Sequence, residues 1–185
     1  MVGTRLDVRH GREAFFRTSG KFNRPKMELE IYRVDKSIKK RVWEIFGKYH
    51  YLNTELNSSA IQYVGVLNGE MVCHTGVLQF PMQRGKKRIH RLVVLPDYQG
   101  VGIGTAFIRK VAEIVDRKGF EVNLTTTTPA LVGALKRDPC WILGRYGRVK
   151  NNYTAFEKRY GLEYKHLANA VSSNRVTYSF WYRNR

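Results

Sequence analysis

The chain has 185 residues, and 43% of them are hydrophobic, which suffices for one globular domain with a sizeable core. It carries 33 lysines and arginines against 15 acidic residues, a formal net charge of +18. This imbalance predicts a polyanionic partner, because clustered cations release counterions from phosphates. No apolar run is long enough to span a membrane, and the polar, basic first residues predict no secretory signal peptide.

The cysteines favour a cytoplasmic protein. Cys73 and Cys140 are isolated in the sequence, so we expect reduced intracellular thiols rather than a disulfide. Neither cysteine has a partner at the spacing of zinc ligands, and we predict no metal site.

The apolar patterns predict a mixed α/β domain. Residues 1–27 are basic and polar, and we interpret them as an extended arm before a single domain of residues 28–185. In chain order the patterns predict a strand at Glu28–Val34, a helix from about residue 37 to Phe46, strands at Ile61–Leu67, Met71–Phe80 and Arg88–Leu95, a helix at Gly102–Lys118, a strand at Phe120–Thr125, helices at Pro129–Leu135 and Thr154–Ala168, and a strand at Val176–Tyr182.

The stretch Arg91–Thr105 carries the strongest functional signal. An apolar run ends at Pro96, and a polar turn leads through Gly100, Gly102 and Gly104 into an amphipathic helix. Glycine lets a ligand approach the backbone closely, and the N–H groups of a first helical turn attract anions. We therefore expect a phosphate or a pyrophosphate as the ligand.

Two common phosphate-binding loops do not fit this stretch. A P-loop ends in Gly-Lys-Ser/Thr, but Gly104 is followed by Thr105 and Ala106. The dinucleotide fingerprint needs its third glycine where Thr105 stands. The remaining pattern is Gln/Arg-x-x-Gly-x-Gly/Ala, met by Gln99, Gly102 and Gly104. It resembles the acetyl-CoA loop of the GNAT superfamily of N-acetyltransferases, as does the preceding Val-Leu-Pro-Asp-Tyr.

This resemblance covers residues 28–182 and implies the GNAT acyl-CoA N-acyltransferase fold, an α/β (α+β) mixed sheet flanked by helices. It implies acetyl-CoA, or another acyl-CoA, as the cofactor. The strand at 88–95 would pair with the pantetheine amides, the helix start would hold the pyrophosphate, and the strands at 88–95 and 120–125 would splay to admit the thioester. The cofactor-binding residues carried over are Leu92, Val93, Val94, Gln99, Gly100, Val101, Gly102, Ile103, Gly104 and Thr105.

A narrower resemblance rests on three segments: Tyr49-His50-Tyr51-Leu52, the stretch 91–100, and the closing Val176–Tyr182. They are similar to segments of the phage Mom DNA-modification proteins and of GNAT domains fused to ABC-type ATPases. This resemblance implies modification of DNA bases. It agrees independently with the net charge of +18.

Acyl transfer to an amine needs a neutral amine and a proton for the leaving thiolate, but no nucleophilic cysteine. His50, with Tyr51 beside it, is the first candidate because an imidazole titrates near neutral pH, and His90 is the rival base. Tyr146 and Tyr153 are the candidate acids. We find no second ligand that would make His50 a metal site.

Two groups of basic residues, one of them interleaved with tyrosines, predict contacts to nucleic acid. Cations pair with phosphates, while aromatic rings stack on splayed or flipped bases. A base amine inside a duplex is out of reach of a thioester in a cleft, so we expect an extruded base or a single strand of DNA. The predicted nucleic-acid-binding residues are Arg84, Lys86, Lys87, Arg88, Arg145, Arg148 and Lys150.

Three functions remain open at this point. The leading hypothesis is an acyl-CoA-dependent N-acyltransferase that modifies an amine of a nucleic-acid base, in phage DNA. The alternatives are a GNAT enzyme for a small amine or a protein lysine, and a non-catalytic nucleic-acid-binding protein of GNAT-like fold. The intact glycine loop argues against the last. The acyl group, the acceptor atom, the choice of DNA over RNA and the oligomeric state, monomer or homodimer, stay open.

Overall fold

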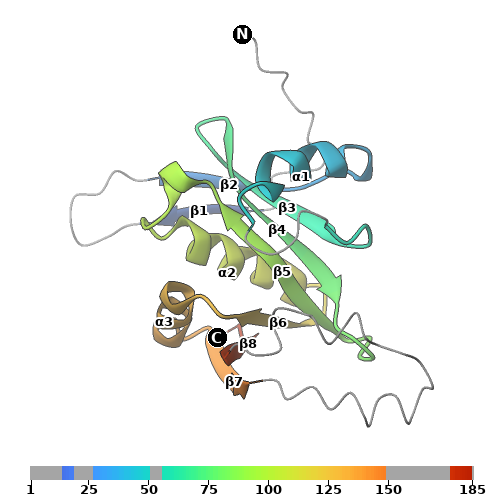
Figure 1. Cartoon of the computed structure of the whole chain (residues 1–185), viewed down its shortest axis with the longest axis vertical. Helices are drawn as coiled ribbons and strands as arrows, with labels where there is room; N and C mark the ends of the chain where they lie inside the picture. Colours follow the sequence, from blue (N-terminus) through green and yellow to red (C-terminus); the bar gives the residue numbers. More distant parts are fainter. Residues whose placement is uncertain (1–13, 19–26, 51–55, 149–175, 185) are drawn as a thin grey trace.

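The computed structural model describes residues 14–18, 27–50, 56–148 and 176–184. Within this part of the chain the predicted strands and helices are present, and Ala14–Thr18 and Trp141–Arg148 form two further strands that the apolar patterns did not predict (Figure 1). The elements are β1 (Ala14–Thr18), β2 (Met27–Arg33), a 3-10 helix (Lys36–Ile38), α1 (Lys39–Gly47), β3 (Ile61–Leu67), β4 (Glu70–Gln79), β5 (Lys86–Val94), a second 3-10 helix (Pro96–Tyr98), α2 (Ile103–Asp116), β6 (Glu121–Thr126), α3 (Pro129–Arg137), β7 (Trp141–Arg148) and β8 (Val176–Tyr182).

The eight described strands form one sheet in the order β1-β2-β3-β4-β5-β6-β8-β7. Neighbouring strands are antiparallel except β5 and β6, which run parallel because α2 connects them across one face. The predicted fold class, a mixed sheet flanked by helices, is confirmed. No helix of the described residues is long and apolar enough to cross a membrane.

Helices cover both faces of the sheet and produce two apolar cores. On one face α2 buries Phe107, Ile108 and Val111 against residues of β2, β6 and β8. On the other face α1 buries Val42 and Phe46 against β3 and β5. Strand β4 lies between the two cores, and for this reason seven of its residues in a row are buried rather than alternating.

Several boundaries follow from local chemistry. The Asp35 side chain accepts a hydrogen bond from the Ser37 N–H at 2.9 Å and thereby begins the first helical segment. Asn68 and Gly69 have φ of 51° and 84°, the left-handed pair that a two-residue hairpin turn requires, and the predicted hairpin is confirmed. The helix predicted at 154–168 lies outside the described residues.

Strand β5 contains a bulge that positions the site. His90 pairs with Gly76 and Val93 with His74, so β5 uses one more residue than β4 over this interval. The extra residue falls next to Arg91, whose φ of 59° lies in the left-handed region. A bulge bends a strand, and β5 pairs with β6 only as far as Ile89.

Candidate active site

A cavity of about 640 Å³ opens where β5 and β6 part. The two strands pair from Lys86 with Glu121 to Ile89 with Leu124, and β5 then continues unpaired on this side to Val94. The second half of β5, the loop into α2, the end of β6 and α3 form the walls. The splay of these strands is therefore present, at the place predicted from the sequence.

The glycine loop forms one end of the cavity. Gly100 and Gly102 have φ of 79° and 91°, a conformation that favours glycine, and added side chains there would meet no atom within 4 Å. The first bond of α2 runs from the Ala106 N–H to the Gly102 carbonyl at 3.1 Å, so the preceding amides of its first turn have no carbonyl partner within the helix. This open cradle of amides fits a diphosphate.

Helix α2 approaches β5 closely at Gly104. A Cβ added to Gly104 would lie 3.0 Å from Val94 Cγ2, tighter than ordinary van der Waals contact. Thr105 lines the cavity, and its hydroxyl donates to the Gly102 carbonyl at 2.9 Å. Gly104 therefore brings the start of the helix next to the unpaired edge of β5, where a bound cofactor would meet both.

The other predicted cofactor residues divide into two groups. Leu92, Val94 and Gln99 line the cavity, but the Gln99 amide donates to the Val94 carbonyl at 2.8 Å. Gln99 therefore fixes the end of β5 rather than pointing at a phosphate. The side chains of Val93 and Ile103 are buried in the two cores, and only their backbones could serve a cofactor.

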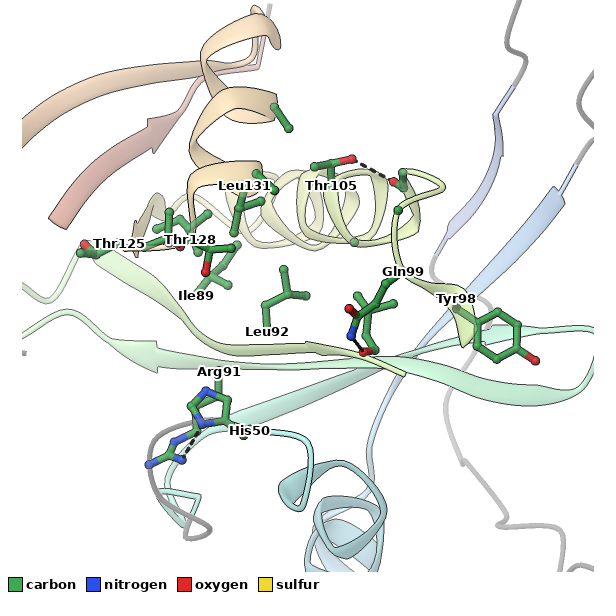
Figure 2. A pocket seen from close by; sticks show the side chains of 18 of the residues that line it. His50, Ile89, Arg91, Leu92, Tyr98, Gln99, Thr105, Thr125, Thr128 and Leu131 are labelled. Atoms are coloured by element: carbon green, nitrogen blue, oxygen red, sulfur yellow. Dashed lines mark hydrogen bonds between the residues drawn. The ribbon is translucent and has the colours of Figure 1, made fainter. Parts of the chain in front are cut away.

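The opposite end of the cavity holds two histidines and an arginine. Figure 2 shows His50 and Arg91 on one side of β5, and Leu131 and Thr105 on the other. Arg91 donates from Nε to His90 Nε2 at 2.9 Å and from Nη1 to His50 Nδ1 at 3.4 Å. The cavity therefore reaches both faces of the sheet through the gap between β5 and β6.

Burial and nearby positive charges favour the neutral form of both imidazoles. Burial, then the Arg91 charge, lowers the pKa of His50. Burial, followed by the charges of Arg91, Arg88 and His50, lowers the pKa of His90 to about 4. Since Arg91 offers only donors, the facing nitrogens His90 Nε2 and His50 Nδ1 carry lone pairs, and the second ring nitrogens carry the protons.

Tyr146 is the one remaining catalytic candidate among the described residues, and it does not line the cavity. Tyr146 lies on the outermost strand β7, is 70% exposed and stacks on Tyr178 with 6.0 Å between ring centroids. Tyr51, Tyr153 and the basic residue Lys150 lie outside the described residues. The described residues contain no group of three His, Cys, Asp or Glu arranged to hold a metal ion.

Several lining residues had no place in the sequence prediction. Tyr98 lines the cavity, and its hydroxyl donates to Glu70 at 2.9 Å. Helix α3 contributes Ala130, Ala134 and Arg137, which recur at the spacing of one helix face. The spacing can be read from the sequence, but the sequence does not show which element this face of α3 contacts. The position of Arg91 depends on the bulge, which left no local signal.

The described residues that line the cavity include two arginines and two histidines but no carboxylate. Together with the amide cradle and the unpaired strand edge, this lining defines an α/β transferase site for a phosphate-bearing cofactor. The chain matches the model of the acetyltransferase (GNAT) family over residues 28–136, and it belongs to this family. It is therefore an N-acyltransferase that takes its acyl group from acyl-CoA.

Solved structures share the fold at low identity. An acetyltransferase from Bacillus cereus ATCC 14579, described as an IAA acetyltransferase, is 17% identical with a TM-score of 0.54, covering 83% of this chain and 98% of its own. A Bacillus subtilis acetyltransferase in complex with CoA is 12% identical with a TM-score of 0.58, covering 85% and 99%. Arabidopsis thaliana Naa50, in complex with a bisubstrate analogue, is 16% identical with a TM-score of 0.54, covering 84% and 99%. No curated protein sequence is significantly similar to this chain.

Proposed function

We propose that this enzyme transfers the acyl group of acyl-CoA to an exocyclic amine of a nucleic-acid base, in phage DNA, as a member of the Mom-like branch of the family. The observation that carries the proposal is the described lining of the cavity, which has two arginines and no acidic residue. This lining lies in a chain with a formal net charge of +18. Both the donor and the acceptor are then expected to be anionic.

The donor side of the cavity fits CoA. The amides from Gly102 to Thr105 would hold the diphosphate, and the free edge of Leu92–Val94 would pair with the pantetheine arm. Arg137 at the far wall adds a charge for phosphate. When bound, the thioester supplies an activated acyl group. Gln99 preserves the course of β5 by its bond to the Val94 carbonyl.

The acceptor side suits an amine that is already neutral. An exocyclic amine of a base is uncharged at neutral pH, so no residue must deprotonate it before attack. A lysine or polyamine amine is protonated at this pH and would approach against the charge of Arg91. The lone pair of His90 Nε2 faces Arg91, and the Nδ1–H group of this ring can donate to a polar atom of the acceptor.

A direct test uses mass spectrometry of nucleosides. The protein would be incubated with acetyl-CoA and single-stranded DNA, and the DNA then digested to nucleosides. The proposal predicts one nucleoside heavier by an acetyl group, with less product from His90→Phe, which keeps an aromatic ring but no ring N–H. Acetylation of small amines or peptide lysines, with no change in any nucleoside, would instead establish the alternative acceptor.

The segment 1–27 remains, in this proposal, a basic arm that accompanies a catalytic domain of residues 28–185. Ala14–Thr18 within it form β1, which pairs with β2. A cytoplasmic location follows from the proposed substrates, since acyl-CoA and DNA occur together there. Removal of residues 1–13 would test the arm: we expect weaker binding of DNA and unchanged binding of CoA.

A further inference from the structure

Alternation along β5 sorts the basic residues of the β4–β5 hairpin onto two faces of the sheet. Ile89 is buried against α2, and the Lys87 ammonium lies 4.6 Å above the Phe120 ring on the same side. Lys86, Arg88 and His90 occupy the alternate positions and face the other side. His90 lines the cavity, so Lys86 and Arg88 lead along one face directly to it.

The rows of the sheet continue this face across β6 and β8. Trp181 pairs with Asn123, which in turn pairs with Arg88, so these three residues form one row. The next row toward the cavity contains Ser179 and Thr125, whose hydroxyls lie 3.2 Å apart. Helix α1 covers β3 and β4 on this side of the sheet, and it does not extend over β6, β8 and β7 (Figure 1).

Strand β7 adds one arginine to each face. Arg145 pairs with Ser179 and therefore shares the face of Trp181. Tyr146 stacks on Tyr178, which packs against the core of α2 and α3, so Arg148 belongs by alternation to the opposite face. Arg145 and Arg148 thus form a matched pair on one strand, as Arg88 and Lys87 do on β5.

Arg88 has an enclosed polar donor on this face. Its side chain is half-buried, and its Nε is enclosed without a hydrogen-bond partner among the described residues. Lys86 is compensated, because its ammonium lies 3.2 Å from the Glu121 carboxylate and 4.9 Å above the Trp181 ring. An enclosed N–H group is usually hydrogen-bonded, and the half-buried guanidinium that carries it suits an anionic ligand.

We propose that Lys86, Arg88 and Arg145, together with Trp181, form an acceptor track that binds a single-stranded polynucleotide and leads one base to the His90 end of the cavity. Alternate residues of a strand lie about 6.8 Å apart, comparable to successive phosphates of an extended chain. Arg88 contacts the phosphate nearest the target base, and the indole contacts a neighbouring base. The identity of the acceptor rests on the proposed function; the location of the track does not.

The test compares the two faces with the full chain and a fluorescently labelled oligodeoxyadenylate of about 12 nucleotides. Arg88→Gln and Arg145→Gln are expected to raise the Kd about fivefold to tenfold and to reduce the salt dependence by about one phosphate contact each. Lys87 and Arg148 were also expected from the sequence to bind nucleic acid, but they lie on the other face. The track therefore predicts that Lys87→Gln and Arg148→Gln change the Kd less than about twofold. Arg88→Lys should recover part of the loss.

Equal losses for Arg88→Gln and Lys87→Gln, or no loss for either, would overturn the track. Thermal unfolding and CoA binding of each variant separate a folding defect from a binding defect. Acetylated nucleosides whose yield is indifferent to Arg88→Gln would refute the track and leave the proposed function standing. Face-selective binding without any acetylated nucleoside would support the track and refute the proposed function.

Discussion

Alanine substitutions of the two glycines at the ends of α2 can separate an effect on cofactor binding from an effect on protein stability. Gly102 caps the start of the helix with φ of 91°, and Gly119 follows its end with φ of 82°. A Cβ at either position would meet no atom within 4 Å. Gly102→Ala and Gly119→Ala therefore impose the same backbone strain, about 1 kcal/mol after the entropic gain of alanine in the unfolded chain.

Each substitution is expected to lower the Tm by about 2–4 °C, the usual equivalent of 1 kcal/mol in a protein of this size. Only Gly102→Ala places a methyl group and a strained residue where amides would hold the diphosphate, so its Kd for CoA should rise at least about tenfold, or 1.4 kcal/mol. Calorimetric titration with CoA measures this difference. Equal Kd values for both variants would refute the assignment of the cradle.

Three further predictions concern the core, the cavity wall and pH. Phe107→Ala is expected to lower the free energy of unfolding by about 3–5 kcal/mol in a denaturant titration, since the ring is fully buried under α2. Arg137→Ala is expected to weaken CoA binding several-fold by calorimetry, whereas Lys136→Ala, whose ammonium lies over the Tyr178 ring, is not. Acidification from pH 7.5 to 5 is expected to lower the free energy of unfolding by about 2 kcal/mol through His74 alone, a loss that His74→Gln removes.

The sign of the pH effect follows from the surroundings of His74. Its Nε2 donates to Gln62 Oε1 at 3.1 Å, and the ring packs on Phe46 and Trp43. Burial, followed by the charge of His50, lowers its pKa to about 3. An unfolded histidine takes up its proton near pH 6.5, so the unfolded state gains protons first and stability is lost as the pH falls from 6.5 toward 3. A wild-type curve parallel to that of His74→Gln would contradict this account.

The outcome for Arg137→Ala also has a clear contrary result. Equal weakening by Arg137→Ala and Lys136→Ala would mean that general surface charge, rather than the cavity wall, attracts CoA. For Phe107→Ala, a loss below about 1 kcal/mol would mean that the core relaxes around the missing ring.

The elements with strong periodicity were predictable from the sequence. The Asn68-Gly69 turn fixes the β3–β4 hairpin, and α2 shows an apolar stripe that begins at a glycine and ends before another. Strand β7 was not predicted, because its exposed edge carries Gly144, Gly147 and charged residues instead of an alternating apolar pattern. Strand β1 was likewise missed within a basic segment.

The candidate site was predictable on one side only. The loop at 100–104 could be predicted because a loop that binds a ligand through its backbone needs glycines, and glycines are visible in the sequence. The acceptor side depends on the bulge at Arg91, which turns one side chain toward both His50 and His90. A bulge is a property of strand pairing, so residues far apart in the sequence decide it. Tyr146 was a candidate acid, but the pairing of β7 with β8 places it at the sheet edge.

The central claim is tested most directly by a competition for one labelled acetyl group. A single reaction would contain isotope-labelled acetyl-CoA, single-stranded DNA, spermidine and a lysine peptide, and the label in each would be counted after separation. The described lining of the cavity, which holds two arginines and no carboxylate, and the acceptor track predict that the label accumulates on DNA bases, with less at high salt. Label on spermidine or the peptide, with none on DNA, would contradict the account.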